Sequence, residues 1–167
     1  MAIETLNHVV LNVGDVARTV AFYRDVLGFT QVIESPKDRY AFLRAPGSAN
    51  HHDLALFAVK DDPDGAANRR ASYGGGRVGM HHIAWQASSL DELEEYRARF
   101  EAAGCLVSVL DHGCNKSVYG VDPDGLDVEI MWLVPPALWG ELEHVAVADA
   151  MDLDAERAKF AALTTSE

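Results

Sequence analysis

The sequence has few cysteines, few basic residues and no long apolar run. Its 167 residues include only two cysteines, Cys105 and Cys114, and no Cys-x-x-Cys pair, which argues against a thiolate zinc or iron–sulfur site. There are 14 Lys and Arg against 26 Asp and Glu, so the formal charge is −12. A chain this acidic lacks the clustered cations that bind nucleic acid. No apolar stretch approaches the roughly 18 residues of a membrane-spanning helix.

The N-terminal residues, the cysteines and the overall composition indicate the kind of protein and its compartment. The first residues, MAIETLNHVV, lack the basic and apolar regions of a secretion signal, and isolated thiols are typical of a reducing compartment. The composition, 49% hydrophobic and 24% charged, is typical of a globular domain. We therefore expect a cytoplasmic protein that binds neither nucleic acid nor membranes. Composition leaves unexplained the seven histidines, four of which form two adjacent pairs.

Two segments of the chain are alike at a constant offset of 74 residues. Leu6–Phe29 and Met80–Cys105 each begin with a short apolar stretch that contains a histidine, and each continues with apolar residues at helical spacing. Asp15 in the first segment and Ser88 or Ser89 in the second are suited to begin the helix. A glycine follows each helix, as is common at helix ends. The sequence therefore predicts two strand–helix units.

The repeat continues into the later strands and divides the rest of the chain. Asp53–Phe57 matches Asp127–Met131 at the same offset, so we predict two βαβββ modules. The expected order is module 1 at about residues 3–60, a connector at 61–79, module 2 at about 79–134, and a C-terminal tail at 135–167. Within the tail, residues 152–163 have the pattern of a short amphipathic helix.

Repeat-equivalent positions provide a candidate metal site. His8 and His82 are equivalent on the first strands, and Glu129 is equivalent to Ala55 on the last strands. Two modules related by a pseudo-two-fold axis bring such positions together, which leaves two imidazoles and one carboxylate as ligands. This set suits non-heme Fe(II), although zinc and manganese fit the same ligands. The alternatives are a structural histidine and a solvent-facing glutamate, and His81 would face the opposite side of its strand from His82.

Several segments resemble the vicinal oxygen chelate superfamily over about residues 3–134. They are His8, Asn12–Asp15, Phe22–Phe29, His82–Ala84 and Asp122–Glu129. The resemblance implies a single α+β domain over residues 1–167. In it, two βαβββ modules form a cupped mixed β-sheet barrel with helices outside and a C-terminal helical tail.

Three features within this resemblance are similar to the extradiol catechol dioxygenases, in particular their single-domain type I members. Ala55 cannot supply the fourth ligand that glyoxalase I carries on the last strand of its first module. His52, in the run His51–Leu56, matches the dioxygenase histidine that acts as acid and base. Tyr119 lies ten residues before Glu129, where those dioxygenases carry a tyrosine.

The resemblance implies a function and roles for these residues. His8, His82 and Glu129 would hold Fe(II), with Mn(II) or another divalent metal as the alternative. The substrates would be a catechol-type aromatic diol and O₂, as in aromatic compound catabolism. His52 would transfer protons and Tyr119 would hydrogen-bond a substrate oxygen.

One expected residue departs from the family pattern. Counting places a further active-site histidine of the larger dioxygenases at Leu110, and His112 would supply that role from a shifted position. Apolar residues that could line the site are Phe42, Phe57, Trp85 and Met131.

Other functions fit the same fold. They are another metal-dependent enzyme, such as a glyoxalase-like lyase, an isomerase or a thiol transferase, and a non-catalytic resistance protein that binds a small molecule. The sequence also leaves open whether the modules pair within one chain or between the two chains of a homodimer.

Overall fold

The structure is a computed structural model that describes residues 3–59 and 79–164. Positions 61–78 of the predicted connector lie outside the described residues. The chain divides into two compact units. Unit 1 consists of Met1–Val78 with Asp122–Leu126, and unit 2 consists of Gly79–Val121 with Asp127–Glu167.

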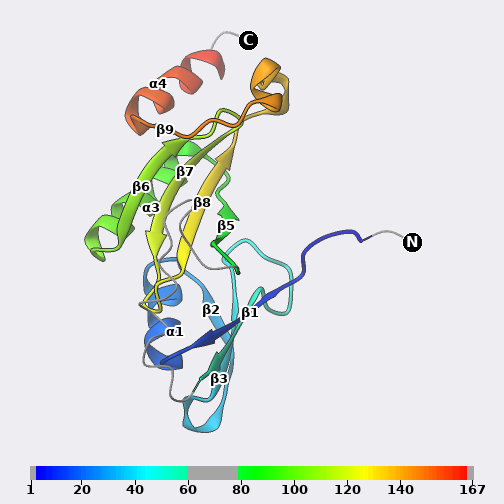
Figure 1. Ribbon diagram of the computed structural model, residues 1–167, viewed down its shortest axis with the longest axis vertical. Coiled ribbons are helices and arrows are strands. Elements are labelled where there is room, and N and C mark those ends of the chain that lie inside the picture. Colours follow the sequence, from blue (N-terminus) through cyan, green and yellow to red (C-terminus); the bar gives the residue numbers. More distant parts are fainter. Residues whose placement is uncertain (1–2, 60–78, 165–167) are drawn as a thin grey trace. The chain divides into compact units, whose positions relative to one another are not determined.

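Unit 1 contains one sheet and one α-helix in its described residues (Figure 1). In chain order its elements are β1 (Val9–Val13), α1 (Val16–Asp25), β2 (Thr30–Glu34), the short 3₁₀ helix η1 (Pro36–Asp38), β3 (Tyr40–Arg44) and β4 (Leu54–Ala58). The strand order in the sheet is β1-β4-β3-β2. β1 runs parallel to β4, and the other neighbours are antiparallel. This is the predicted βαβββ module.

Unit 2 repeats this topology and extends it (Figure 1). Its elements are β5 (His82–Gln86), α3 (Leu90–Ala102), β6 (Leu106–Asp111), β7 (Asn115–Val121), β8 (Asp127–Leu133), η2 (Pro136–Leu138), η3 (Gly140–His144), β9 (Asp149–Ala150) and α4 (Leu153–Thr164). The strand order is β5-β8-β7-β6-β9, with β5 parallel to β8. The tail therefore adds a short antiparallel edge strand to the second module.

The α+β class and the repeat are confirmed, but the predicted barrel is not closed. The described strands form a four-stranded and a five-stranded sheet, and both sheets are open. In unit 1 the edges are β1 and β2, and in unit 2 they are β5 and β9. A closed barrel would need its first and last strands to be hydrogen-bonded to each other.

Both long helices begin and end where the sequence predicts. The Asp15 side chain accepts a hydrogen bond from the backbone N–H of Arg18, and the Ser89 hydroxyl accepts one from Glu92 N–H. The Glu92 carboxylate in turn accepts from the backbone N–H of Ser88, the residue before the N-cap, so a second N–H at this helix start has a partner. Gly28 and Gly104 follow the helices with φ of 77° and 66°, a conformation that disfavours side chains with a Cβ.

Each sheet buries one face against its helix. In unit 1 the buried strand residues are Leu11, Val13, Ala41, Leu43, Leu54 and Leu56, and α1 contributes Val16, Val20 and Tyr23. In unit 2 the corresponding strand residues are Ile83, Val118, Val128 and Ile130, and α3 contributes Leu90, Leu93 and Phe100. Because side chains alternate along a strand, the opposite face of each sheet is left for other contacts.

The Asp-Pro-Asp-Gly turn between β7 and β8 belongs to unit 1 and holds the start of α1. Asp124 Oδ1 accepts hydrogen bonds from Gly14 N–H at 2.9 Å and from the Arg18 guanidinium at 3.0 Å. Its Oδ2 accepts from the Thr19 hydroxyl at 2.7 Å. A carboxylate at a helix N-terminus is favourable because the first N–H groups lack partners within the helix.

The predicted tail helix is α4, and ion pairs attach it to unit 2. Lys116 is 3% exposed, and its ammonium lies 2.5 Å from Asp111 and 3.2 Å from Glu156 of α4. Arg157 of α4 pairs with Asp91 of α3. No helix in residues 3–59 and 79–164 is both long and apolar enough to cross a membrane.

Candidate metal centre

His82 and Glu129 come together on neighbouring strands of unit 2. Ala84 of β5 is the register partner of Glu129 of β8, so His82, two residues earlier, projects from the same face. His82 Nε2 lies 3.0 Å from Glu129 Oε2. Glu129 is only 5% exposed, and a buried carboxylate needs a positive or hydrogen-bonding partner.

This pair has the chemistry and spacing of two metal ligands. Imidazole nitrogens and carboxylate oxygens bind divalent metals at about 2.1 Å, and two such atoms at right angles around one ion lie about 3 Å apart. Within residues 3–59 and 79–164, no group of three His, Cys, Asp or Glu side chains is arranged to hold a metal ion. The fit to a metal therefore rests on His82 and Glu129 of unit 2.

The other oxygen of Glu129 is occupied by a neighbouring hydroxyl. Ser117 Oγ donates to Glu129 Oε1 at 2.6 Å, and Asn115 Nδ2 donates to Ser117 Oγ at 2.8 Å. Ser117 is fully buried, and it is the register partner of Met131 on β8, two residues beyond Glu129. The carboxylate is thus held in one orientation, with Oε2 directed to His82.

Tyr119 and His112 lie on the same part of unit 2. Tyr119 is the register partner of Glu129, and its ring is 5.7 Å from that of His82. His112 Nε2 lies 3.1 Å from the Tyr119 hydroxyl, and His112 Nδ1 lies 2.7 Å from the backbone carbonyl of Val147. A carbonyl only accepts, so Nδ1 carries a proton. Nε2 of the neutral ring is then free to accept from the Tyr119 hydroxyl.

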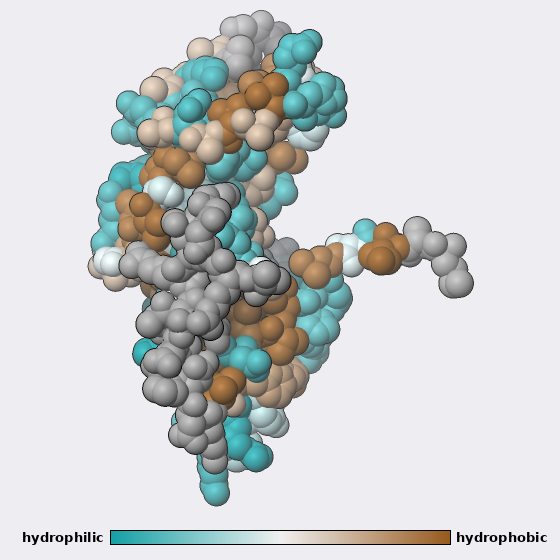
Figure 2. Space-filling model, viewed as in Figure 1, coloured by the Kyte–Doolittle hydropathy of each residue, from teal (hydrophilic) through white to brown (hydrophobic). Residues whose placement is uncertain are grey.

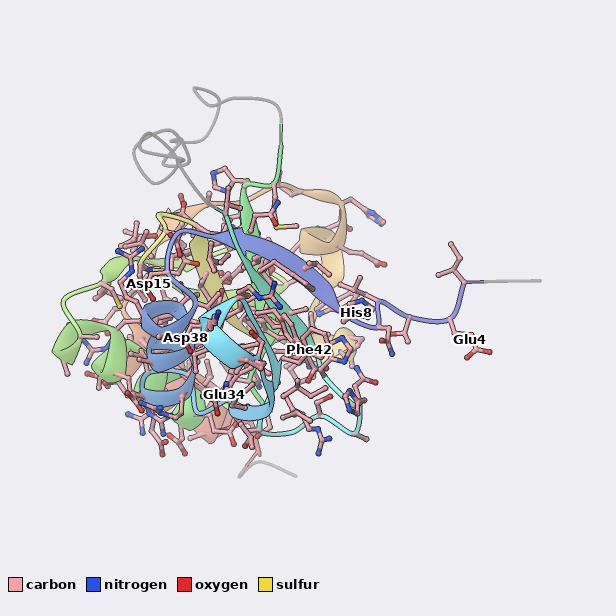
Figure 3. The ribbon with its side chains drawn as sticks, turned by 90° about the horizontal axis from the view of Figure 1, so that it is seen from below. Glu4, His8, Asp15, Glu34, Asp38 and Phe42 are labelled. Atoms are coloured by element: carbon pink, nitrogen blue, oxygen red, sulfur yellow. The ribbon has the colours of Figure 1, made fainter. Side chains whose placement is uncertain are left out.

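His8 and His52 come together in unit 1. His8 immediately precedes β1, and His52 lies two residues before β4 begins. Their rings are 4.7 Å apart, and the His52 ring stacks on Phe42 at 4.7 Å and 18°. Figure 3 shows His8 and Phe42 near each other on this sheet. Because His52 precedes the strand, the alternation along β4 does not direct its ring away from His8.

The surroundings of His52 favour its neutral form. Burial lowers the pKa of His52, and the neighbouring rings of His8 and His51 lower it further, whereas Asp53 opposes the shift. His52 Nδ1 also lies 3.0 Å from His51 Nδ1. A neutral imidazole with one engaged nitrogen can accept a proton at its other nitrogen.

Position 55 provides no ligand in unit 1. Ala55 lies between its register partners Val10 of β1 and Phe42 of β3. Phe57 and Tyr40 are the next pair along the same face. Apolar side chains remain exposed in this unit (Figure 2), and they include Ile3, Leu6, Val10 and Phe57. This face resembles an aromatic wall more than a metal site.

Sequence reasoning misplaced one candidate and missed others. Trp85 alternates with His82 along β5, so it lies on the opposite face and does not line the candidate site. Ser117 and the carbonyl of Val147 were not singled out from the sequence. A period-two pattern from Tyr119 could have found Ser117, but nothing local in the sequence pairs Val147 with a histidine 35 residues earlier.

Comparison with known proteins gives relatives of more than one activity. The chain is 27% identical to a catechol-2,3-dioxygenase of Bacillus subtilis over 86% of this chain and 48% of that protein. It thus spans about half the length of this dioxygenase. It is also 29% identical to the metallothiol transferase FosB of Staphylococcus saprophyticus, over 77% of this chain and 76% of that protein.

Solved structures and a family model agree on the fold. A lactoylglutathione lyase from Agrobacterium tumefaciens matches with a TM-score of 0.57 and 27% identity, over 84% of this chain and 99% of that one. Residues 5–130 match the model of the Glyoxalase/Bleomycin resistance protein/Dioxygenase superfamily. The match covers the first module and the second as far as the middle of β8. The chain therefore belongs to this superfamily.

Proposed function

We propose that the protein is an Fe(II)-dependent extradiol dioxygenase that opens the ring of a catechol-type diol with O₂. His8, His82 and Glu129 are the proposed metal ligands, and Mn(II) or another divalent metal is the alternative to iron. One observation carries the proposal: His82 Nε2 and Glu129 Oε2 lie at the spacing of two ligands, with the Tyr119 hydroxyl group on the neighbouring strand. The diol dioxygenases among the relatives support it.

When Fe(II) is bound, a set of two histidines and one carboxylate would leave coordination positions open for the diol oxygens and O₂. Side chains of the protein then accept and donate the protons. His52, held neutral by its surroundings, accepts a proton from a diol hydroxyl as the diol binds. It would later return that proton as the ring opens beside the two hydroxyls.

Tyr119 and His112 act on the substrate oxygen. Before the diol binds, the Tyr119 hydroxyl donates its one proton to His112 Nε2 at 3.1 Å, which holds the tyrosine in place. When the diol is bound, the hydroxyl would turn that proton to the substrate oxygen while negative charge develops on it. Phe42 and Phe57 in unit 1 and Met131 in unit 2 supply apolar surface of the kind that an aromatic ring prefers.

The test is to load the purified protein with Fe(II) anaerobically and then add a panel of catechols in air. We expect O₂ uptake together with a yellow product that absorbs at longer wavelength than the catechol. The matched control is Glu129→Ala treated in the same way, which should give neither signal. O₂ uptake indistinguishable from that control across the whole panel would reject the dioxygenase proposal.

A second candidate is a metal-dependent thiol transferase or lyase. The similarity to FosB supports it, because the chain covers 76% of that protein but only 48% of the catechol-2,3-dioxygenase. Such an enzyme would use a redox-inactive metal and would consume no O₂. Thiol consumption with an electrophilic substrate, in protein that is loaded with Mn(II) and inactive towards catechols, would favour this candidate.

A further inference from the structure

We propose that Asn7, His81 and Ser117 are positioning residues, each of which orients one proposed metal ligand by binding its non-ligating atom. This inference rests on the proposed ligands of the preceding section. It does not depend on which reaction the metal supports. Each contact lies within a single unit of the structure.

Ser117 fixes the carboxylate. Its hydroxyl donates to Glu129 Oε1 at 2.6 Å, a length typical of a hydrogen bond to a charged acceptor. Asn115 Nδ2 binds the same hydroxyl oxygen, so the Ser117 proton is left for Glu129. With Oε1 occupied and the group buried, Glu129 presents Oε2 alone to a metal.

The two histidines are held in the same way at repeat-equivalent positions. His8 Nδ1 lies 2.9 Å from Asn7 Oδ1, and His82 Nδ1 lies 2.9 Å from His81 Nδ1. Asn7 and His81 are themselves separated by the repeat offset of 74 residues. An amide oxygen only accepts, so His8 Nδ1 carries the proton and its Nε2 has the lone pair that a metal requires.

The same logic applies to His82. A metal at its Nε2 requires the ring proton at Nδ1, which can then donate to His81 Nδ1. Outer partners that fix the ring orientation and tautomer of a ligating histidine strengthen metal binding. The contacts of Asn7 and Ser117 therefore define Nε2 of His8 and Oε2 of Glu129 as the atoms offered. The His81 contact can hold the His82 proton at Nδ1 when a metal binds Nε2.

The test measures the affinity of the full chain for Mn²⁺ by competition with a chromogenic chelator. We expect Ser117→Ala to weaken binding by about tenfold to a hundredfold, and Ser117→Thr, which keeps the hydroxyl, to restore most of it. The matched control is Ser108→Ala on β6, the same substitution on the strand next to Tyr119. The visible spectrum of the Co²⁺-loaded protein should change in Ser117→Ala and not in Ser108→Ala.

Substitutions of His81 and Asn7, which contact the two proposed histidine ligands, test the inference independently of Ser117. His81→Ala should weaken Mn²⁺ binding, and His81→Asn, which keeps an acceptor, should weaken it less. Asn7→Ala should have the smallest effect because water can replace an exposed amide oxygen. If Ser117→Ala does not fold, as judged by thermal unfolding, the two His81 variants decide the matter.

The outcomes separate this inference from the proposed function. Wild-type affinity in Ser117→Ala and His81→Ala, with loss in Glu129→Ala, would overturn the inference and leave the dioxygenase proposal standing. Metal binding that depends on Ser117, without ring cleavage of any catechol, would support the inference and reject the dioxygenase. A wild-type chain that binds no divalent metal would overturn both.

Discussion

The two units have the same backbone topology but different chemistry on equivalent faces. In unit 1, Ala55 of the last strand lies between Val10 and Phe42, whereas in unit 2 Glu129 lies between Ala84 and Tyr119. The helices, the parallel outer pair of strands and the positive-φ glycines recur in both. A repeat can therefore preserve a fold while one side chain decides which half carries the carboxylate.

The difference extends to the next register pair. Tyr40 and Phe57 are paired in unit 1, and Ser117 and Met131 occupy the equivalent places in unit 2. The Tyr40 and Phe57 rings are 5.8 Å apart, whereas Ser117 donates to Glu129. One half thus supplies aromatic surface, and the other supplies the carboxylate together with its hydrogen-bond donor.

The largest effect is expected from removing that carboxylate. Glu129→Ala leaves position 129 like position 55, so the variant should lose the Fe(II) and the ring cleavage that the proposed function assigns to the wild type. Metal analysis after gel filtration, alongside O₂ uptake, measures both. Glu129→Gln is the matched variant, because it keeps an acceptor for Ser117 but loses the charge. Full iron content in Glu129→Ala would show that the two units differ in something other than the metal ligand.

The next effect concerns proton transfer in unit 1. His52→Ala should retain iron but lose about 10²–10⁴ of kcat, because it removes the proposed acid and base. His144→Ala is the control, since His144 is an exposed histidine of η3 that is not among the proposed site residues. Steady-state kinetics with iron-loaded proteins checks this. Equal kcat in the two variants would remove His52 from the catalytic set.

The sequence predicted the fold better than the site. The offset of 74 residues, the helix caps at Asp15 and Ser89 and the ending glycines are local signals, and the structure contains all of them. The expected cupped barrel is not closed in the structure, and the sequence could not predict this because pairing between edge strands leaves no local signal. The contact between His112 and the Val147 carbonyl was also beyond prediction, because it depends on where the tail returns to β6.

A third comparison concerns Asp53 and its equivalent, Asp127. Asp53 is buried, and it accepts hydrogen bonds from Ala45 N–H, Ser48 Oγ and Asn50 Nδ2 at 2.7–2.9 Å. Burial alone would raise its pKa, but these donors hold the pKa below the usual value. Asp127 is half-buried. We therefore expect Asp53→Asn to destabilise the protein by about 3 kcal/mol at pH 7, and Asp127→Asn to cost less.

The pH dependence of stability shows whether Asp53 stabilises the fold through its ionised carboxylate or only through the packing of its side chain. A lowered pKa stabilises the folded state at pH values above the unfolded value of about 3.9, and the stabilisation is lost as the pH falls through the folded pKa. The difference in the free energy of unfolding between wild type and Asp53→Asn should therefore shrink below about pH 4. Urea unfolding at a series of pH values measures this difference, and a constant difference would contradict the assignment.

The smallest effect is expected from a core substitution at a place where the two units fill the space between helix and sheet with different residues. Gly120 of β7 pairs with Val128, as Leu43 of β3 pairs with Leu54 in unit 1. A Cβ at Gly120 would lie 2.8 Å from the Phe100 ring, and Phe100 is fully buried. The large side chain is thus on the helix in unit 2 and on the strand in unit 1.

Gly120→Ala should therefore cost about 1–3 kcal/mol by overpacking, measured by urea unfolding. Phe100→Leu alone should also destabilise, because it leaves unfilled space. In the double variant the smaller Leu side chain leaves room for the new methyl group. The double variant should therefore lose less stability than the sum of the two single losses, by about 0.5 kcal/mol or more. Strictly additive losses would mean that Gly120 is required by the backbone of β7 rather than by the Phe100 ring. The placement of the large side chain on the helix in unit 2 and on the strand in unit 1 would then not explain how the two units differ.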